Sequence, residues 1–286
     1  MKKFVAILIL LAIVLAGCVR EESAQLAATT LPVWEFTTAL CDGSGITVTR
    51  IVTEEVSCLH DYTVKVSQMR AVEHGEAVIC SGLGLETFLE DVLSSANYVI
   101  DASQGMTPLC ADEHSHDGHH HEHDPHIWLS PEYAKQMSRN ICDKLCGLYP
   151  EHSTLFQENL TELLEQLDAL QSYGETTLKD LSCRELITFH DGFRYLADSF
   201  DLTICKAIEE ESGSEASAKE LVELIELVNE KNLPAVFTER NGSTAAAQII
   251  AKQTGVAVYA LDMAMAGDSY FDAMYRNIDT IKEALG

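Results

Sequence analysis

The sequence predicts an α/β protein of two lobes, each with a four-stranded parallel sheet and flanking helices, joined by one long rigid helix. In both halves of the chain, short β-branched apolar segments alternate with amphipathic helical segments, the pattern of parallel strand–helix units. Between the halves, residues 150–180 carry apolar side chains at spacings of three and four. Such a helix would reach ~45 Å, further than one small domain, so we expect it to connect two domains.

Residues 1–17 predict an export signal that ends at a lipid-attachment site. The apolar segment Phe4 to Ala16 would span ~20 Å as a helix, too short for a ~30 Å hydrocarbon core. The segment from Leu15 to Cys18 resembles the bacterial lipobox, which implies cleavage before Cys18 and a lipid on its thiol. The alternative is a plain secretory signal. We expect an extracytoplasmic lipoprotein anchored to the cell membrane, with residues 18–25 as a tether.

The expected N-terminal lobe, residues 26–149, contains four strand–helix units. Pro32 and Pro131 stand where a first helical residue is expected, and Ser67 is a suitable N-cap. The strands are expected at residues 26–31, 46–52, 76–80 and 97–101, and the helices at 32–40, 67–74, 85–96 and 131–149.

The expected C-terminal lobe, residues 181–286, repeats this alternation without strong sequence identity to the first half. Gly255 follows a helical segment at the position where a C-terminal glycine is favoured. The strands are expected at residues 185–190, 202–208, 235–239 and 257–262, and the helices at 192–200, 217–232, 243–254 and 269–285. The helix over residues 150–180 links the two lobes.

The composition narrows the class of ligand. The formal charge is −26, from 45 acidic and 19 basic residues, and a surface this acidic repels nucleic acid and anionic lipid while it attracts divalent cations weakly. Eight cysteines follow Cys18, and no disulfide pairing is assigned among them. Because the chain has no CxxC…CxxC pattern, a thiolate zinc site is the weaker hypothesis.

Residues 112–125 form a His-rich loop. Seven of the eleven histidines lie between His114 and His126, interspersed with acidic residues. Imidazole is the commonest protein ligand for zinc and its neighbours, so this composition predicts metal binding, with a solvated polar loop as the alternative. The loop has almost no apolar residues and cannot fold alone, so the organised metal site is expected elsewhere, beginning at His126.

Four side chains stand where parallel strands end, and ligands bind beyond the carboxyl ends of such strands. They are two from each half of the chain: His60, His126, His190 and Asp262. Three imidazoles and one carboxylate suit Zn²⁺. Glu239 also ends a strand and would be a fifth ligand, a partner that orients a histidine, or a helix cap, of which we favour the second. Three acids next to candidate histidines are expected to be solvated or to orient those histidines: Asp61, Asp124 and Asp191.

Seven motifs, in order along almost the whole mature chain, carry a resemblance to a known family. They are His60-Asp61-Tyr62, Ser81 to Glu86, Asp124 to Pro131, Thr188 to Asp191, Phe237-Thr238-Glu239, Ala260-Leu261-Asp262 and Ser269 to Asn277. Together they resemble the zinc- and manganese-specific solute-binding proteins of ABC importers. The resemblance implies two α/β lobes with the metal held between them by His60, His126, His190 and Asp262. Histidine at position 190, like the His-rich loop, is typical of the zinc branch.

The chain departs from that family at several positions. The run after His60 lacks the usual prolines, and Arg240 and Met263 replace the prolines that usually follow the Glu239 and Asp262 positions. Cys58 lies two residues from His60, where its thiolate would compete for zinc.

The resemblance implies a monomeric, non-enzymatic carrier that binds Zn²⁺ tightly and delivers it to an ABC permease, with the His-rich loop as an accessory, weaker collector. Manganese or another divalent ion is the alternative cargo. Two other classes stay open at this point. A zinc hydrolase would need an open coordination position, but the chain has no HExxH motif and a fourth ligand at Asp262 would close the site. A surface adhesin would use zinc only structurally.

Overall fold

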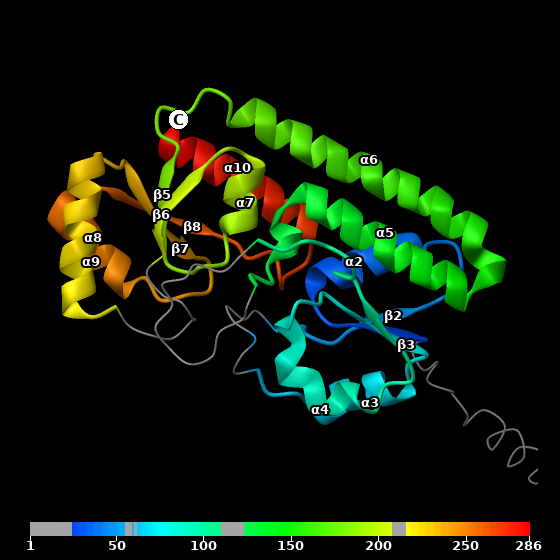
Figure 1. Ribbon diagram of the computed structural model, residues 1–286. Helices are drawn as coiled ribbons and strands as arrows, with labels where there is room; N and C mark the ends of the chain where they lie inside the picture. Colours follow the sequence, from blue (N-terminus) through cyan, green and yellow to red (C-terminus); the bar gives the residue numbers. More distant parts are fainter. Residues whose placement is uncertain (1–24, 55–58, 60–61, 110–122, 208–215) are drawn as a thin grey trace, which may run out of the picture.

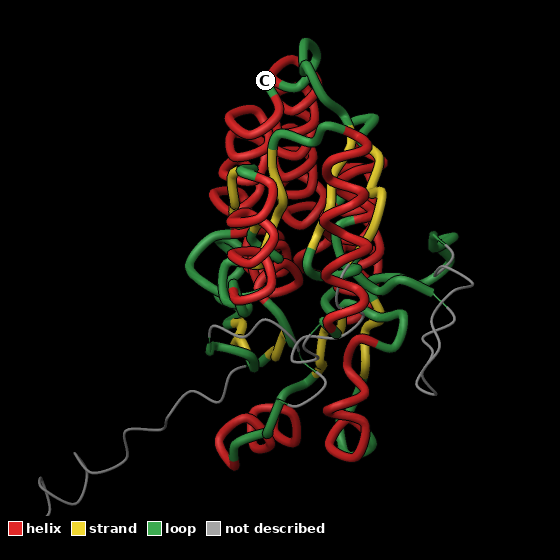
Figure 2. The backbone as a smooth tube through the Cα atoms, turned by 90° about the vertical axis from the view of Figure 1, so that its left-hand side faces the viewer, coloured by secondary structure: helices red, strands yellow, loops and turns green. Residues whose placement is uncertain are grey.

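The computed structural model describes residues 25–54, 59, 62–109, 123–207 and 216–286. Two parallel sheets lie at opposite ends of the molecule, and one long helix runs along both (Figure 1). Figure 2 shows the strands lying between layers of helices. Among the described residues, no helix combines the length and the apolar character that a membrane span requires. The two-lobed α/β prediction is therefore confirmed.

The N-terminal sheet has the strand order β2-β1-β3-β4, and all its pairs are parallel. Its strands are β1 (Leu26–Ala28), β2 (Val48–Arg50), β3 (Ala77–Cys80) and β4 (Val99–Asp101), and its helices are α2 (Leu31–Leu40), α3 (Val66–His74), α4 (Glu90–Leu93) and α5 (Pro131–Leu148). Successive residues of a strand face opposite sides, so Leu26 packs towards α2 and α5 whereas Ala27 packs towards α3 and α4. Every residue of the central strands β1 and β3 is buried, which explains why these two strands are apolar throughout, whereas the edge strands β2 and β4 include polar and partly exposed residues.

The C-terminal sheet repeats the same relative order, β6-β5-β7-β8. Its strands are β5 (Glu185–Thr188), β6 (Thr203–Ala207), β7 (Ala235–Glu239) and β8 (Ala257–Leu261), and its helices are α7 (Arg194–Ser199), α8 (Ala218–Lys231), α9 (Ala245–Thr254) and α10 (Tyr270–Leu285). One face packs Ile187 and Val236 against α8 and α9. The other face joins a hydrophobic core that continues into the N-terminal lobe.

The connecting helix is α6 (Ser153–Thr177), preceded by a 3-10 turn, η3 (Pro150–His152). It packs against α2 and α5 of the first lobe and α10 of the second. The stripe predicted from its apolar spacing is buried at Phe156, Leu160, Leu163, Leu167 and Leu170. The long helix therefore bridges the two lobes as the sequence predicts.

One expected helix is broken. Residues 85–96 form a 3-10 helix, η1 (Leu85–Leu89), followed by the short α4, because the backbone of Glu86 leaves helical geometry. Its buried carboxylate accepts hydrogen bonds from the Ser81 and Gly82 amides and from the Thr29 hydroxyl. Burial raises the pKa of Glu86 to about 7. Glu86 thus connects the loop after β3 to Thr29 at the end of β1, and the expected continuous helix over residues 85–96 does not form.

Residues 263–270, which we call the crossing segment, tie the C-terminal lobe to the N-terminal lobe. The Leu31 amide donates to the Met265 carbonyl at 3.0 Å, and the Arg50 guanidinium donates to the Gly267 carbonyl at 2.6 Å. Glu35 of α2 accepts a hydrogen bond from the Tyr270 amide, at the first turn of α10, at 2.7 Å. The crossing segment therefore follows the last strand of the second lobe in the sequence, yet it forms hydrogen bonds with the first lobe.

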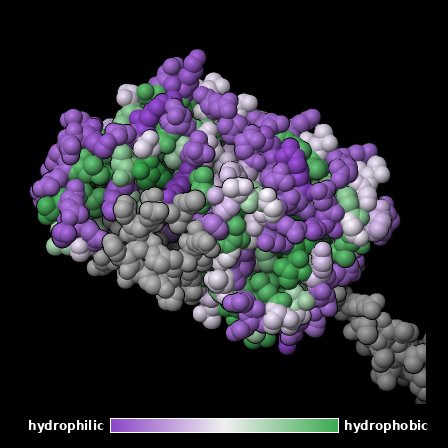
Figure 3. All heavy atoms as spheres, viewed as in Figure 1, coloured by the Kyte–Doolittle hydropathy of each residue, from purple (hydrophilic) through white to green (hydrophobic). Residues whose placement is uncertain are grey.

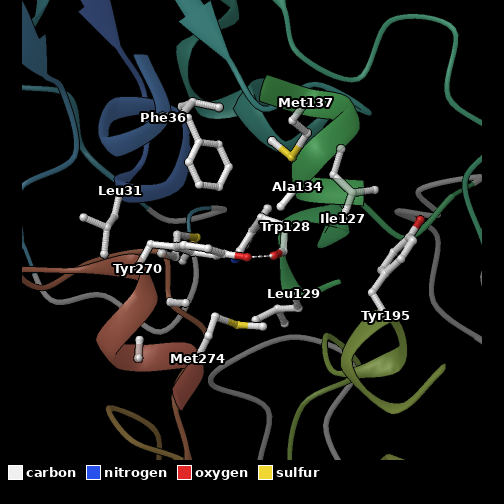
Figure 4. Close-up of a cluster of buried hydrophobic side chains, with 14 of the residues drawn as sticks. Leu31, Phe36, Ile127, Trp128, Leu129, Ala134, Met137, Tyr195, Tyr270 and Met274 are labelled. Carbon is white, nitrogen blue, oxygen red and sulfur yellow. Dashed lines mark hydrogen bonds between the residues drawn. The ribbon is translucent and has the colours of Figure 1, made fainter. Parts of the chain in front are cut away.

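Trp128 anchors the crossing segment to the first lobe. It lies in the 3-10 turn η2 (Ile127–Leu129), which immediately precedes α5. Its indole Nε1 donates to the Met263 carbonyl at 2.7 Å. Its own carbonyl accepts from the Tyr270 hydroxyl at 2.8 Å, as Figure 4 shows. Both aromatic side chains are fully buried, and the Tyr270 ring also stacks edge-on against Phe36. This cluster fixes how the two lobes meet.

We expect Tyr270→Phe to lower the free energy of unfolding by about 1–2 kcal/mol, because the Trp128 carbonyl would lose a partner inside a dry core. Urea unfolding followed by circular dichroism measures the loss as a lower midpoint at an unchanged slope. Tyr98→Phe, at a tyrosine that is 44% exposed, is the matched control and should change stability by less than about 0.5 kcal/mol. Equal midpoints for Tyr270→Phe and the wild type would contradict this role.

Candidate metal centre

His126 and His190 meet where the two lobes face each other. His126 directly precedes η2 in the first lobe, and His190 follows β5 in the second. Their Nε2 atoms are 3.4 Å apart and their rings are almost perpendicular, at 86°. His190 is buried, and the His126 side chain is 13% exposed. Two of the four predicted ligands are therefore brought together from residues that are far apart in the sequence.

Each imidazole has a carboxylate on its Nδ1 side, away from the other histidine. The Nδ1 atom of His126 lies 2.8 Å from Asp124 Oδ1, which also accepts the His126 backbone amide at 2.9 Å. The Nδ1 atom of His190 lies 3.6 Å from Glu239 Oε1. An acid at Nδ1 favours the tautomer that carries its proton there, which leaves Nε2 with a lone pair. Asp124 and Glu239 are thus placed to orient the two histidines, as the sequence analysis favours for Glu239.

The separation of the two Nε2 atoms fits a shared metal ion. Two nitrogens bound to one tetrahedral Zn²⁺ at 2.0–2.1 Å would stand roughly 3.3 Å apart, close to the 3.4 Å found here. A direct hydrogen bond across this gap would require a proton on one Nε2, whereas a cation satisfies both lone pairs at once. The pair is therefore suited to a nitrogen-preferring divalent cation.

Gly192 leaves room beside this pair. A Cβ atom on Gly192 would lie 2.6 Å from His190 Cδ2 and 2.9 Å from His190 Nε2. The same position is 2.6 Å from the terminal methyl of Met263, so the Met263 side chain and the His190 ring border the same space. The Trp128 ring stands edge-on to His126 at 5.4 Å between centroids. Sequence reasoning missed Gly192 and Trp128, because neither residue type signals a metal site.

Asp262, the acidic ligand of the prediction, is engaged elsewhere in the structure. Its Oδ2 atom lies 3.1 Å from Arg276 Nη2 and 3.7 Å from Arg240 Nη1. Within the part of the chain that the structure describes, no group of three or more His, Cys, Asp or Glu side chains is arranged to hold a metal. The four-residue ligand set stays a prediction, of which the structure assembles the two imidazoles.

Several predicted features lie outside the described residues. These are His60 and its neighbours Cys58 and Asp61, the predicted lipidation site Cys18, and residues 112–122 of the His-rich loop. Asp191, which precedes α7, forms an ion pair with Arg194 at the start of that helix, with Oδ1 2.8 Å from Arg194 Nε. The described cysteines are free thiols: Cys41, Cys80, Cys142, Cys146, Cys183 and Cys205.

Comparison with known proteins gives one consistent match. The family model described as ZnuA, the periplasmic component A of a zinc-uptake complex, matches residues 26–284. A protein of Treponema pallidum (strain Nichols), provisionally named metal-binding, is 31% identical over 262 residues, which are 86% of this chain and 83% of that protein. The crystal structure of ZnuA superposes with a TM-score of 0.79 at 30% identity and covers 92% of this chain and 100% of that one.

A further relative is longer than this chain. The zinc-binding lipoprotein AdcA of Streptococcus pneumoniae serotype 4 is 27% identical over 297 residues. The match covers 96% of this chain but 59% of AdcA, so this chain spans little more than half of that relative.

We expect Gly192→Ala to weaken binding of a divalent metal at the imidazole pair by roughly tenfold or more, because the added methyl group must displace His190 or Met263. Calorimetric titration with Zn²⁺ measures the change. Gly147→Ala in α5, where a Cβ atom meets nothing within 4 Å, is the matched control and should leave affinity unchanged. Equal affinities for Gly192→Ala and the wild type would show that His190 does not need this space.

Proposed function

This chain belongs to the family of periplasmic zinc-uptake components, and we propose that it is an extracytoplasmic binding protein that captures Zn²⁺ with high affinity and delivers it to an ABC permease. The observation that carries the proposal is the buried pair of imidazoles at the meeting of the lobes, with Nε2 atoms 3.4 Å apart and a carboxylate behind each ring. The names of the relatives, which specify zinc uptake and zinc binding, support the choice of cargo.

In this proposal His126 and His190 form the centre of the site, and His60 and Asp262 complete it from the loops after β2 and β8. Neutral imidazole is a borderline ligand that suits Zn²⁺, whereas Mn²⁺ prefers oxygen. The site therefore favours zinc, with manganese as the weaker cargo. Four protein ligands would leave no open position for an activated water, so the metal is carried rather than used in catalysis.

The proposed protein works at a membrane surface. Residues 1–17 would be removed as a signal, Cys18 would carry the lipid, and residues 18–25 would form the tether. The lipoprotein name of AdcA supports this anchor. The lobes would comprise residues 26–149 and 181–286 with residues 150–180 between them, and the carrier would act as a monomer. The face in Figure 3 is largely hydrophilic and the whole chain has a formal charge of −26, which suits such an exposed protein.

Removing either central imidazole tests the site. We expect His126→Ala and His190→Ala each to weaken Zn²⁺ binding by more than about 100-fold, beyond the loss that follows removal of a residue that only orients a ligand. A competition titration against a chelator of known affinity measures the loss. His74→Ala in α3, at an exposed histidine, is the matched control. Wild-type affinity in both variants would rule out this site.

The role of the His-rich loop is tested separately. Deleting residues 113–122 should preserve one tight Zn²⁺ per chain and remove only additional, weaker zinc, because the loop cannot build an organised site alone. Calorimetry over a wide range of zinc concentrations distinguishes the two classes of binding. Loss of the tight class would move the principal site into the loop.

A further inference from the structure

Two arginines from different elements hold the carboxylate that the proposed site requires. Arg276 lies in α10 and approaches Asp262 Oδ2 to 3.1 Å, and Arg240 follows β7 and approaches the same oxygen to 3.7 Å. The second oxygen, Oδ1, accepts the Ala264 amide at 2.9 Å. Both oxygens of Asp262 therefore have partners within the protein, and the side chain is only 16% exposed.

The backbone of Asp262 is fixed at the same time. Its amide donates to Asn277 Oδ1, and its carbonyl accepts from Asn277 Nδ2, each at 2.7 Å. Asn277 is buried one residue beyond Arg276 on α10. Because this double hydrogen bond holds the main chain, Asp262 can turn towards a metal only by rotating its side chain. That rotation would exchange the arginines for the cation.

We propose that Arg240 and Arg276 set the metal selectivity of this protein by competing with the bound ion for Asp262. A cation that binds well to imidazole retains most of its affinity while the carboxylate stays with the arginines. A cation that depends on oxygen ligands, such as Mn²⁺, must break the arginine contacts to gain its carboxylate. The arginines therefore penalise oxygen-preferring ions more than Zn²⁺. This inference rests on the proposed function.

The size of the effect follows from the exposure of the two arginines. Their side chains are 51% and 53% exposed, so solvent screens both ion pairs, and such pairs contribute little individually. The competition should therefore shift affinity by small factors, roughly two- to fivefold for Zn²⁺ on removal of Arg276. The 3.7 Å contact of Arg240 predicts a smaller change than the 3.1 Å contact of Arg276.

The test measures Zn²⁺ and Mn²⁺ affinities of the full chain with Arg276→Gln, Arg240→Gln and both together. We expect both ions to bind more tightly in the variants, Mn²⁺ by the larger factor, so that the preference for zinc falls. The gain should disappear in the background of Asp262→Asn, which has no carboxylate to release. Arg139→Gln, an exposed arginine in α5, controls for removing one positive charge from this acidic chain.

If the wild type binds Zn²⁺, any of three results for the variants would overturn the inference. Unchanged affinities in the double variant would show that the arginines do not compete. Weaker binding of both ions would show that they position Asp262 for the metal instead. An equal gain with Asp262→Asn would show a general charge effect. Failure of the wild type to bind Zn²⁺ would instead contradict the proposed function.

Discussion

The structure depends on the docking of the crossing segment, residues 263–270, into the N-terminal lobe. Trp128 is central to this contact, because it binds the Met263 carbonyl through its indole and the Tyr270 hydroxyl through its own carbonyl. The same tryptophan ring stands edge-on to the ring of His126, and Met263 and His190 both border the space beside Gly192. Trp128 thus links the crossing segment directly to His126, one of the two histidines that meet between the lobes.

The imidazole pair places two nitrogen donors where the lobes of an acidic protein meet. The chain carries a charge of −26, and carboxylates are abundant, yet Asp124 and Glu239 lie at the Nδ1 atoms of the two rings rather than between their Nε2 atoms. In this arrangement Asp124 and Glu239 supply negative charge to the rings without occupying the gap that separates the Nε2 atoms. A metal entering the gap would meet two nitrogens first, which is a preference set by position as well as by residue type.

Much of the fold could be predicted from the sequence, because parallel strands buried on both faces leave a strong pattern of apolar segments. The same topology explains why His126 and His190 could be named as neighbours, since both follow strands whose carboxyl ends face the other lobe. The pairing of Asp262 with Arg240 and Arg276 could not be predicted, because it depends on side chains of three elements packed in space. The break of the helix over residues 85–96 was missed because the role of Glu86 depends on the loop after β3.

The contacts between the lobes also constrain how a metal could enter. A rotation that separated the lobes at the crossing segment would break the bonds of Leu31, Arg50 and Trp128, each worth about 0.5–1.5 kcal/mol net, and would expose the fully buried ring of Tyr270. Turning the carboxylate of Asp262 requires side-chain torsions, the loss of its hydrogen bond from the Ala264 amide and the exchange of two ion pairs with half-exposed arginines. The second change is much the smaller in free energy. Rearrangement of side chains around a fixed crossing segment is therefore the route that this structure favours for completing the proposed metal site.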